Sequence, residues 1–373
     1  MDTPRPVVLQ LFQAAQDLDA GDRDAAIAKV DQLLADTPAD GEAVDRLARA
    51  FASALKARIT GDAVGVGNLY VDTRDPRDML KAFEVLAAAT PFIRFGHAAA
   101  NHALLHAIGT ARQVHIVDIG LGSGVQWMHL LDAIAPDTRA SMSLRITGID
   151  VPVPGPDPEA RLKQAGAVLA DRARALGIDF AFVPVAGLVE QLDLHALVDP
   201  THPCLVVNAA LALHHVPVTD GRRDAVLSRL RALNPAALCL VEPDVEHNAL
   251  PFGPRVTESI IHYLTVFDAL AATLDGHGAE RATLESAFFG REILNIVVGE
   301  GDERVERHER HDAWHARLTG DGYRPIDLTQ VHATVAKELS VSAPFAIIDD
   351  GTFMVLTWRD LPVLAVSAWA AGR

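Results

Sequence analysis

The sequence has few cysteines and no long apolar run. Its two cysteines, Cys204 and Cys239, stand in apolar stretches, and no spacing of cysteine and histidine resembles a zinc site. We therefore expect two buried, reduced thiols. No window of about 18 residues is apolar and free of charge, and residues 1–10 carry no basic-then-apolar signal region. These absences predict a cytoplasmic protein without a membrane partner.

Basic residues are scarce as well. The chain has 33 Lys and Arg against 49 Asp and Glu, so its net charge is 33 − 49 = −16. This balance argues against a broad basic face, and no helix shows a basic recognition pattern, so we expect no nucleic-acid partner. Hydrophobic residues, at 49%, are numerous enough to build a large core. The length of 373 residues suggests two or three units, or one domain with a large addition.

The first 110 residues are predicted to be helical. Apolar residues recur at helical spacing, and Gly61 and Pro91 interrupt the pattern. The helical stretches cover residues 7–37, 40–59 and 78–110, with a loop at 62–77. We expect residues 1–110 to form an N-terminal helical cap.

Short apolar runs and helical segments alternate after Val114. The runs span residues 114–120, 144–150, 180–186, 204–210 and 237–243. This alternation predicts an α/β fold, a doubly wound and mainly parallel sheet covered on both faces. Two further runs near the end predict a C-terminal β-hairpin. We therefore expect a Rossmann-like core of the class I methyltransferase type over residues 111–373.

Two segments do not follow this alternation. Residues 257–274 form an apolar-faced helical pattern, so we expect an insertion at about 244–290 that joins the cap. Residues 303–310 alternate in charge, which is typical of a solvated, ion-paired helix face.

A glycine-rich segment follows the first predicted strand. Gly120, Gly122 and Gly124 precede a helix, and Asp150 ends the next strand. Glycines allow a sharp turn and a close approach to a ligand, and a carboxylate at the second strand end can accept ribose hydroxyls. A tight structural turn is the alternative interpretation. The pattern favours a nucleoside cofactor.

The spacing favours S-adenosylmethionine over a nicotinamide dinucleotide. A dinucleotide fingerprint requires glycine where Val125 stands. The leading acid, Asp118, can contact the amino-acid end of S-adenosylmethionine directly or through water. We add Gln126, just after the glycines, and Asn208, at the end of the fourth strand, to the predicted cofactor site.

Candidate catalytic residues follow the fourth and fifth strands. His215 or His247 could act as general base, because histidine titrates near neutral pH. Glu242 and Tyr263 are candidates for positioning. A metal site built from Glu242, Asp244 and His247 is the weaker interpretation, because no second cluster supports it, and we expect no metal.

Several motifs taken together resemble the plant GRAS domain. They occur in the family's order at Val114–Asp118, Gln126-Trp127, Leu144–Ile149, Leu213–Val216, Val241–Leu270, Gly290–Trp314 and Ser367–Trp369. The resemblance covers the chain from about residue 40. With no long regulatory extension before it, and with a high-GC type of composition, the chain resembles a stand-alone bacterial GRAS-domain protein.

The resemblance implies a methyltransferase-type core with a helical cap. Plant members are mostly transcriptional co-regulators that act through protein contacts. Glu242, His247 and Asn248 match family positions, whereas Pro243 and Glu246 differ. Plant sequences have usually lost the glycine loop and often lack the acid at position 150, and this chain keeps both.

The retained loop leads us to expect an enzyme. The main prediction is an S-adenosylmethionine-dependent methyltransferase that acts on a small molecule in bacterial secondary metabolism. One alternative is attack within the cofactor, which closes a ring and releases methylthioadenosine. Another is a non-catalytic GRAS-type ligand-binding or regulatory scaffold. Apolar stretches on the cap could equally form a dimer face, so a homodimer stays open.

Overall fold

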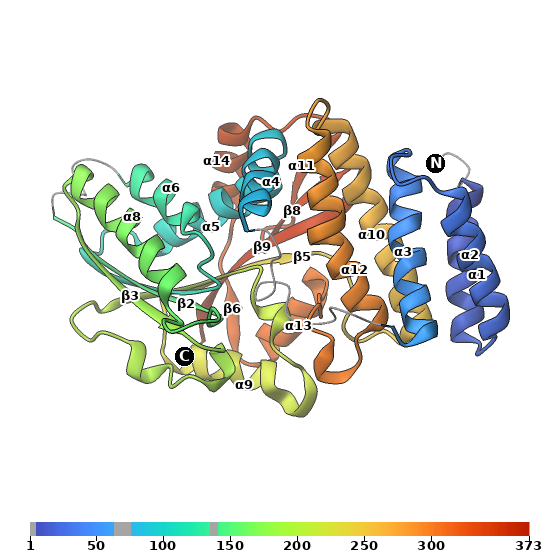
Figure 1. Ribbon diagram of the computed structural model, residues 1–373. Coiled ribbons are helices and arrows are strands. Elements are labelled where there is room, and N and C mark those ends of the chain that lie inside the picture. The colour runs from blue at the N-terminus through green and yellow to red at the C-terminus, as the bar shows by residue number, and fades with distance from the viewer. Residues whose placement is uncertain (1–4, 63–75, 135–140, 373) are drawn as a thin grey trace. The chain divides into compact units, whose positions relative to one another are not determined.

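The computed structural model describes residues 5–62, 76–134 and 141–372 (Figure 1). These residues fall into two compact units. The first takes the described residues within 1–92, 244–310 and 358–363, and the second takes those within 93–243, 311–357 and 364–373. Most of the predicted loop at 62–77 lies outside the described residues.

The first unit is helical. Its helices are α1 (Pro6–Asp19), α2 (Arg23–Asp36), α3 (Ala43–Thr60), α4 (Pro76–Ala89), α10 (Phe252–Thr273), α11 (Gly278–Thr283) and α12 (Phe289–Val298). Figure 1 shows α1, α2, α3, α10 and α12 side by side as a bundle. Their apolar faces share a core that includes Leu11, Phe51 and Phe267. Gly61 ends α3 in the left-handed conformation, which glycine adopts without strain.

The second unit holds a mixed sheet. Its strands are β1 (Gln113–Ile119), β2 (Ser143–Asp150), β3 (Asp179–Ala186), β4 (Cys204–Ala210), β5 (Ala237–Pro243), β6 (Tyr323–Pro325), β7 (Phe345–Asp349), β8 (Phe353–Trp358) and β9 (Leu361–Ala371). Residue 358 at the end of strand β8 and residues 361–363 at the start of strand β9 are assigned to the first unit. The order is β3-β2-β1-β4-β5-β9-β8-β7, with β6 beside β9. The first five strands are parallel, and β9 is antiparallel to β5. The predicted α/β fold and its first five strands are confirmed.

Helices cover both faces of this sheet. They are α5 (Phe92–Ile108), α6 (Val125–Ala133), α8 (Ala160–Leu176), α9 (Arg222–Ala232), α13 (His311–Gly320) and α14 (Thr329–Leu339). Figure 1 shows α6 and α8 on one face of the parallel strands and α9 on the other, as right-handed crossovers require. Among the helices of the described residues, none combines the length and the apolar character that crossing a bilayer would require.

The charged segment after α12 is not the solvated helix that its pattern predicts. Residues 304–310 have no regular structure, and residues 306–309 are no more than 3% exposed. Backbone carbonyls explain how the positive charge of Arg307 can be buried here, because Arg307 donates to the carbonyls of Gly301 and Asp302. The solvated-helix prediction is therefore wrong.

Candidate functional site

The three glycines form the turn between β1 and α6 in the second unit. All three have positive φ, at 86°, 59° and 76° for Gly120, Gly122 and Gly124. A Cβ on Gly120 would lie 2.8 Å from the Cβ of Ala212, so the absence of a side chain lets the loop after β4 pack closely. A Cβ on Gly122 would meet nothing within 4 Å. Backbone conformation and packing thus explain Gly120 without a ligand, whereas Gly122 faces open space.

Asp150 already has partners within the chain. Its Oδ2 accepts the Gly122 N–H at 3.1 Å, and its Oδ1 accepts the Val151 N–H at 2.7 Å. Its Oδ1 also lies 3.0 Å from the Arg161 guanidinium. The side chain is 11% exposed. A ribose hydroxyl would have to share the Asp150 carboxylate with these partners.

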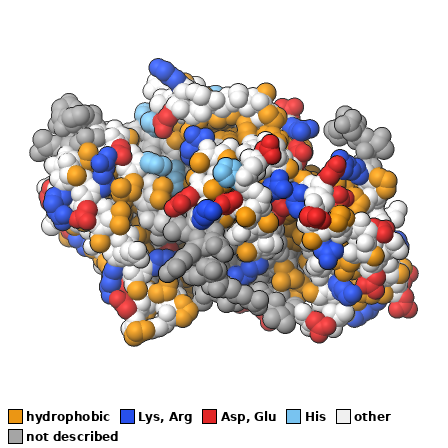
Figure 2. Space-filling view, turned by 45° about the horizontal axis from the view of Figure 1, so that its top comes forward, with side chains coloured by type: hydrophobic (Ala, Val, Ile, Leu, Met, Phe, Trp, Pro, Cys, Tyr) orange, Lys and Arg blue, Asp and Glu red, His pale blue; other side chains and the backbone are white. Residues whose placement is uncertain are grey.

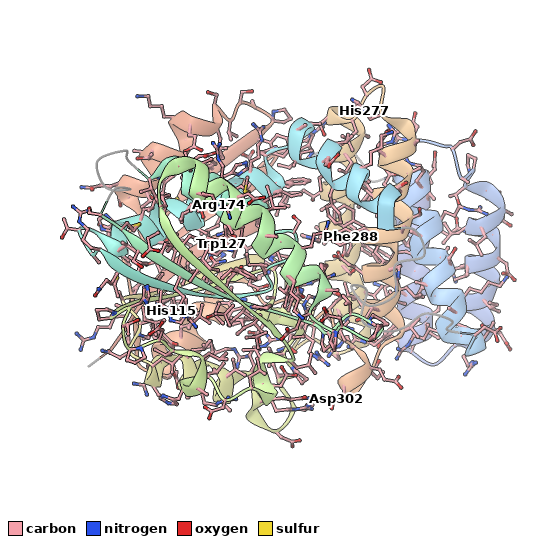
Figure 3. The ribbon with its side chains drawn as sticks, turned by 60° about the vertical axis from the view of Figure 1, so that its left-hand side comes forward. His115, Trp127, Arg174, His277, Phe288 and Asp302 are labelled. Atoms are coloured by element: carbon pink, nitrogen blue, oxygen red, sulfur yellow. The ribbon has the colours of Figure 1, made fainter. Side chains whose placement is uncertain are left out.

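Asp118 is the centre of a buried polar network to which Trp127, labelled in Figure 3, belongs. The parallel register places Asp118 of β1 beside Asn208 of β4, and Asn208 donates to its Oδ1 at 2.7 Å. The indole N–H of Trp127 donates to Oδ2 at 2.6 Å. The Gln126 amide bonds to both Asn208 and Asn101. Asp118 is 2% exposed, and both of its carboxylate oxygens accept hydrogen bonds inside the fold. It therefore does not fit the role of a direct cofactor contact.

Burial raises the pKa of Asp118 to about 7, although its bonds to Asn208 and Trp127 act in the opposite direction. Near neutral pH the carboxyl therefore exists in both protonation states. Its role in this geometry is to join β1, β4 and α6, with α5 attached through Asn101.

We expect Trp127→Phe to destabilise the protein by about 1–3 kcal/mol more than Trp314→Phe. Trp127→Phe leaves a buried carboxylate oxygen without its donor. Trp314 is also buried, but its indole nitrogen has no hydrogen-bond partner among the described residues, so it is a matched control for loss of ring size. Urea unfolding at pH 8 measures both losses. Equal losses would show that the indole N–H contributes nothing.

The residues at the ends of β4 and β5 form a second cluster. Glu242 of β5 pairs with the imidazole of His214, and its other oxygen accepts the N–H groups of Leu213 and His214 at 2.9 and 3.3 Å. The ring of His215, the predicted base, packs against that of His214 in a tilted arrangement, with centroids 3.9 Å apart. Arg223, fully buried, donates to the carbonyls of His214 and Val216. Glu242 thus holds the turn after β4 in place.

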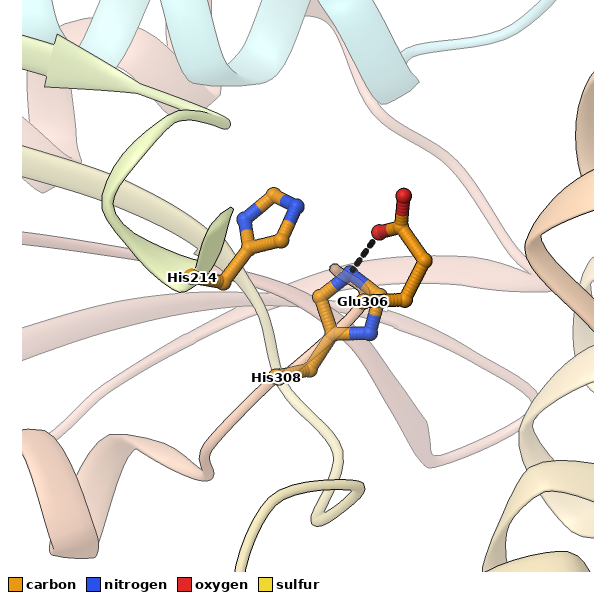
Figure 4. A group of neighbouring side chains, drawn as sticks. All are labelled: His214, Glu306 and His308. Atoms are coloured by element: carbon orange, nitrogen blue, oxygen red, sulfur yellow. Dashed lines mark ion pairs between the residues drawn. The ribbon is translucent and has the colours of Figure 1, made fainter. Parts of the chain in front are cut away.

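His247 and Tyr263 belong to the first unit, so the structure defines no common site for them and the cofactor residues. Their rings stack with centroids 6.2 Å apart, and the Tyr263 hydroxyl donates to Glu292 at 2.7 Å. His247 is fully buried, and burial together with His308 holds its pKa well below the usual value. His308 in turn lies 3.3 Å from Glu306, an ion pair that Figure 4 draws. This set of rings and acids stabilises the core of the first unit.

Comparison with known proteins decides between these interpretations. The model of the GRAS domain family matches residues 7–370. The chain belongs to the GRAS domain family. The crystal structure of SCL7 from Oryza sativa has 30% sequence identity, and a TM-score of 0.84 over 98% of this chain and 100% of that one.

Curated relatives agree with the family assignment. Chitin-inducible gibberellin-responsive protein 2 of Oryza sativa subsp. japonica is 32% identical over 88% of this chain and 62% of its own length. DELLA protein DWARF8 of Zea mays is 30% identical over 97% of this chain and 60% of its own length. The chain thus spans less than two thirds of either relative. Both relatives are plant proteins, so they do not support the bacterial origin, which stays a prediction.

These findings overturn the predicted enzyme. A putative sarcosine dimethylglycine methyltransferase from Galdieria sulphuraria has only 10% identity and a TM-score of 0.40, which carries no argument about activity. The relatives that match along the chain are GRAS proteins. The predictions of a methyltransferase, of a methylthioadenosine-releasing cyclase, of secondary metabolism and of a small-molecule substrate are therefore wrong. The exclusion of nucleic acid as a partner, which rested on net charge and on the lack of a basic recognition helix, is also unsupported by the GRAS relatives.

The structure explains why the sequence suggested an enzyme. A glycine at a strand end and an acid in the next strand are also what a tightly packed turn needs, since Gly120 meets Ala212 and Asp150 holds the Gly122 N–H. Sequence reasoning missed Trp127 and Arg161 as partners of the acids, and Asn101 as the partner of Gln126. Trp127 had a signal, because it follows Asp118 by nine residues at the start of a helix.

Proposed function

We propose that this chain is a non-catalytic GRAS-type regulatory module that acts through contacts with other macromolecules. The similarity to SCL7 along the whole chain, at 30% identity and a TM-score of 0.84, carries the proposal. Contacts with partner proteins are what the GRAS resemblance implies for such a module. On the face shown in Figure 2, acidic, basic and hydrophobic side chains are intermixed, a surface that suits polar protein contacts.

The geometry supports this proposal in a second way. Both oxygens of Asp118 accept hydrogen bonds inside the fold, and Glu242 accepts a backbone N–H of the β4–α9 connection. A general acid or base has to reach a substrate proton directly or through one water, and these carboxyl groups are 2% exposed. The hydrogen bonds of Asp118 and Glu242 hold the strand ends and loops of the second unit in fixed positions, and a rigid scaffold of this kind suits a binding module.

Two assays test this function. The first fuses the chain to a heterologous DNA-binding domain and measures a reporter, whose output we expect to change relative to the DNA-binding domain alone. The second incubates the purified chain with methyl-labelled S-adenosylmethionine and a small-molecule extract. We expect no label transfer and no methylthioadenosine above the level of heat-denatured protein. Turnover in the second assay would overturn the proposal.

A ligand-sensing version is the second candidate. The open space at Gly122 and the carboxylate of Asp150 favour an adenosine-type ligand, and S-adenosylmethionine stays a prediction. Asp150 and the Gly122 backbone would hold such a ligand at the turn, after Arg161 gives way. Calorimetric titration with S-adenosylmethionine and S-adenosylhomocysteine, with Asp150→Ala as the control, tests it. Binding without turnover would support sensing, and no binding would leave a scaffold.

A cytoplasmic location also stays a prediction.

A further inference from the structure

Two arginines of the first unit converge on one oxygen. Arg58 of α3 and Arg255 of α10 each direct a terminal nitrogen at Oε1 of Glu300, at 2.8 and 3.1 Å. Glu300 follows α12 and its side chain is 55% exposed, whereas the Arg255 side chain is 3% exposed. The arrangement is that of an anion held between two guanidinium groups.

The two guanidinium groups are fixed independently of Glu300. Arg58 donates to the carbonyls of Val297 and Val298 at the end of α12, and Arg255 donates to the carbonyl of Ile296 at 3.1 Å. The ring of Phe252 lies beneath both, with its centroid 4.2 Å from Cζ of Arg58. Because backbone and ring hold them, the donors would keep their places if the carboxylate left.

Positive charge exceeds negative charge at this point, in a chain whose net charge is −16. Arg304 lies close enough to Arg255 that burial, together with this neighbour, lowers the pKa of Arg304 to about 10. Burial and the charge of Arg58 likewise lower the pKa of Arg255. Glu300 and, for Arg304, Glu246 act against this repulsion. A single carboxylate between the first two arginines leaves their charge incompletely balanced.

Glu300 is also placed so that its carboxylate could move away from the two arginines. It stands between Gly299 and Gly301, and Gly301 has a positive φ of 51° with open space around its Cβ position. Gly301 permits the backbone to change conformation at low cost, whereas Gly299 is packed against Asn295 and Arg304. The exposed carboxylate is therefore the part of the cluster that can swing out.

We propose that Arg58 and Arg255, with Arg304 beside them, form a binding site for a phosphate group, which Glu300 fills from within the chain. A phosphate dianion matches two guanidinium charges better than one carboxylate does. The phosphate can be free or carried by a phosphorylated side chain of a partner. The competing explanation is that both arginines only cap the carbonyls at the end of α12.

The test removes the internal carboxylate and leaves the caps intact. In Glu300→Gln, we expect a lower melting temperature than in the wild type in chloride, because the buried guanidinium of Arg255 loses its counter-charge. Inorganic phosphate at constant ionic strength should restore the melting temperature in a saturable way. If Glu300 occupies the site nine-tenths of the time, phosphate should bind the variant about tenfold more tightly than the wild type.

Two further arms complete the experiment. Adding Arg58→Gln to Glu300→Gln should abolish the phosphate response, with circular dichroism as the check on folding. Phosphorus NMR of a phosphoserine peptide, against inorganic phosphate, distinguishes a partner's phosphate from a free one. If folded wild type and Glu300→Gln give no saturable response to either probe, the arginines are only caps and the proposal is overturned.

Discussion

Gly120→Ala should destabilise the protein by about 2–5 kcal/mol. Two costs add. An alanine at φ +86° pays about 1–2 kcal/mol for the left-handed conformation. Its Cβ would also lie 2.8 Å from the Cβ of Ala212, and such overpacking typically costs about 1–3 kcal/mol. Ala212 is too short to move aside by rotation, so the backbone of one loop has to shift.

Gly122→Ala is the matched control. It introduces the same methyl group at φ +59°, but nothing lies within 4 Å of the new atom. Only the conformational cost remains, about 1–2 kcal/mol. Urea unfolding of both variants measures the difference. Equal losses would mean that the approach of the β1–α6 and β4–α9 loops is not what requires glycine at position 120.

This pair of variants also separates two reasons for a glycine-rich turn. A ligand-binding loop needs its glycines where the ligand approaches, and the open position is Gly122. A packing loop needs them where another backbone approaches, and that position is Gly120. The sequence cannot distinguish the two, because Ala212 comes from a loop about 90 residues further along the chain.

The parallel strands were predictable because their signal is local. Runs such as residues 114–120 are mostly apolar, as burial on both faces of a sheet favours, and Gly or Pro marks the ends of several of them. The edge strand β7 was not predicted. Its side chains alternate between inside and outside over only five residues, with Ile348 54% exposed, so apolar content alone gives no clear strand signal.

The partners of the charged residues could not be predicted. The alternating charges of residues 303–310 suggested solvent, yet Arg304 and Arg307 bond to backbone carbonyls that no sequence pattern reveals. For the candidate site, the register of adjacent strand ends could be anticipated, as between Asp118 and Asn208. The donor to the other oxygen of Asp118 is Trp127, which lies on α6, and the rotation of that helix is set by packing.

Lowering the pH from 7 to 5 should destabilise the protein by about 3 kcal/mol or more. Burial, the largest cause in each case, lowers the pKa of His97 and His115 to about 4 and that of His262 to about 3. In the unfolded chain these groups titrate near pH 6.5. Below pH 6.5 the unfolded state binds protons that the folded state does not, so stability falls until the pH reaches the folded pKa.

At pH 5 this difference amounts to about 2 kcal/mol for each of the three histidines, since one pH unit corresponds to about 1.4 kcal/mol. His247 adds a loss of the same sign. Asp118 has the opposite sign, because its folded pKa of about 7 is raised above the ordinary 3.8. Its contribution is lost as the pH rises through 7, and it regains about 2–3 kcal/mol at pH 5. The histidines therefore outweigh the carboxyl.

His262→Gln isolates one histidine of the set. Its ring lies 6.0 Å from that of His247 and is 9% exposed, so glutamine keeps a polar side chain but removes the titration. We expect the loss between pH 7 and pH 5 to shrink by about 2 kcal/mol in this variant. His277→Gln, at an exposed histidine labelled in Figure 3, should leave the loss unchanged. Urea unfolding at the two pH values measures all three proteins. An undiminished loss in His262→Gln would mean that His262 is protonated in the folded state, in contradiction to its burial.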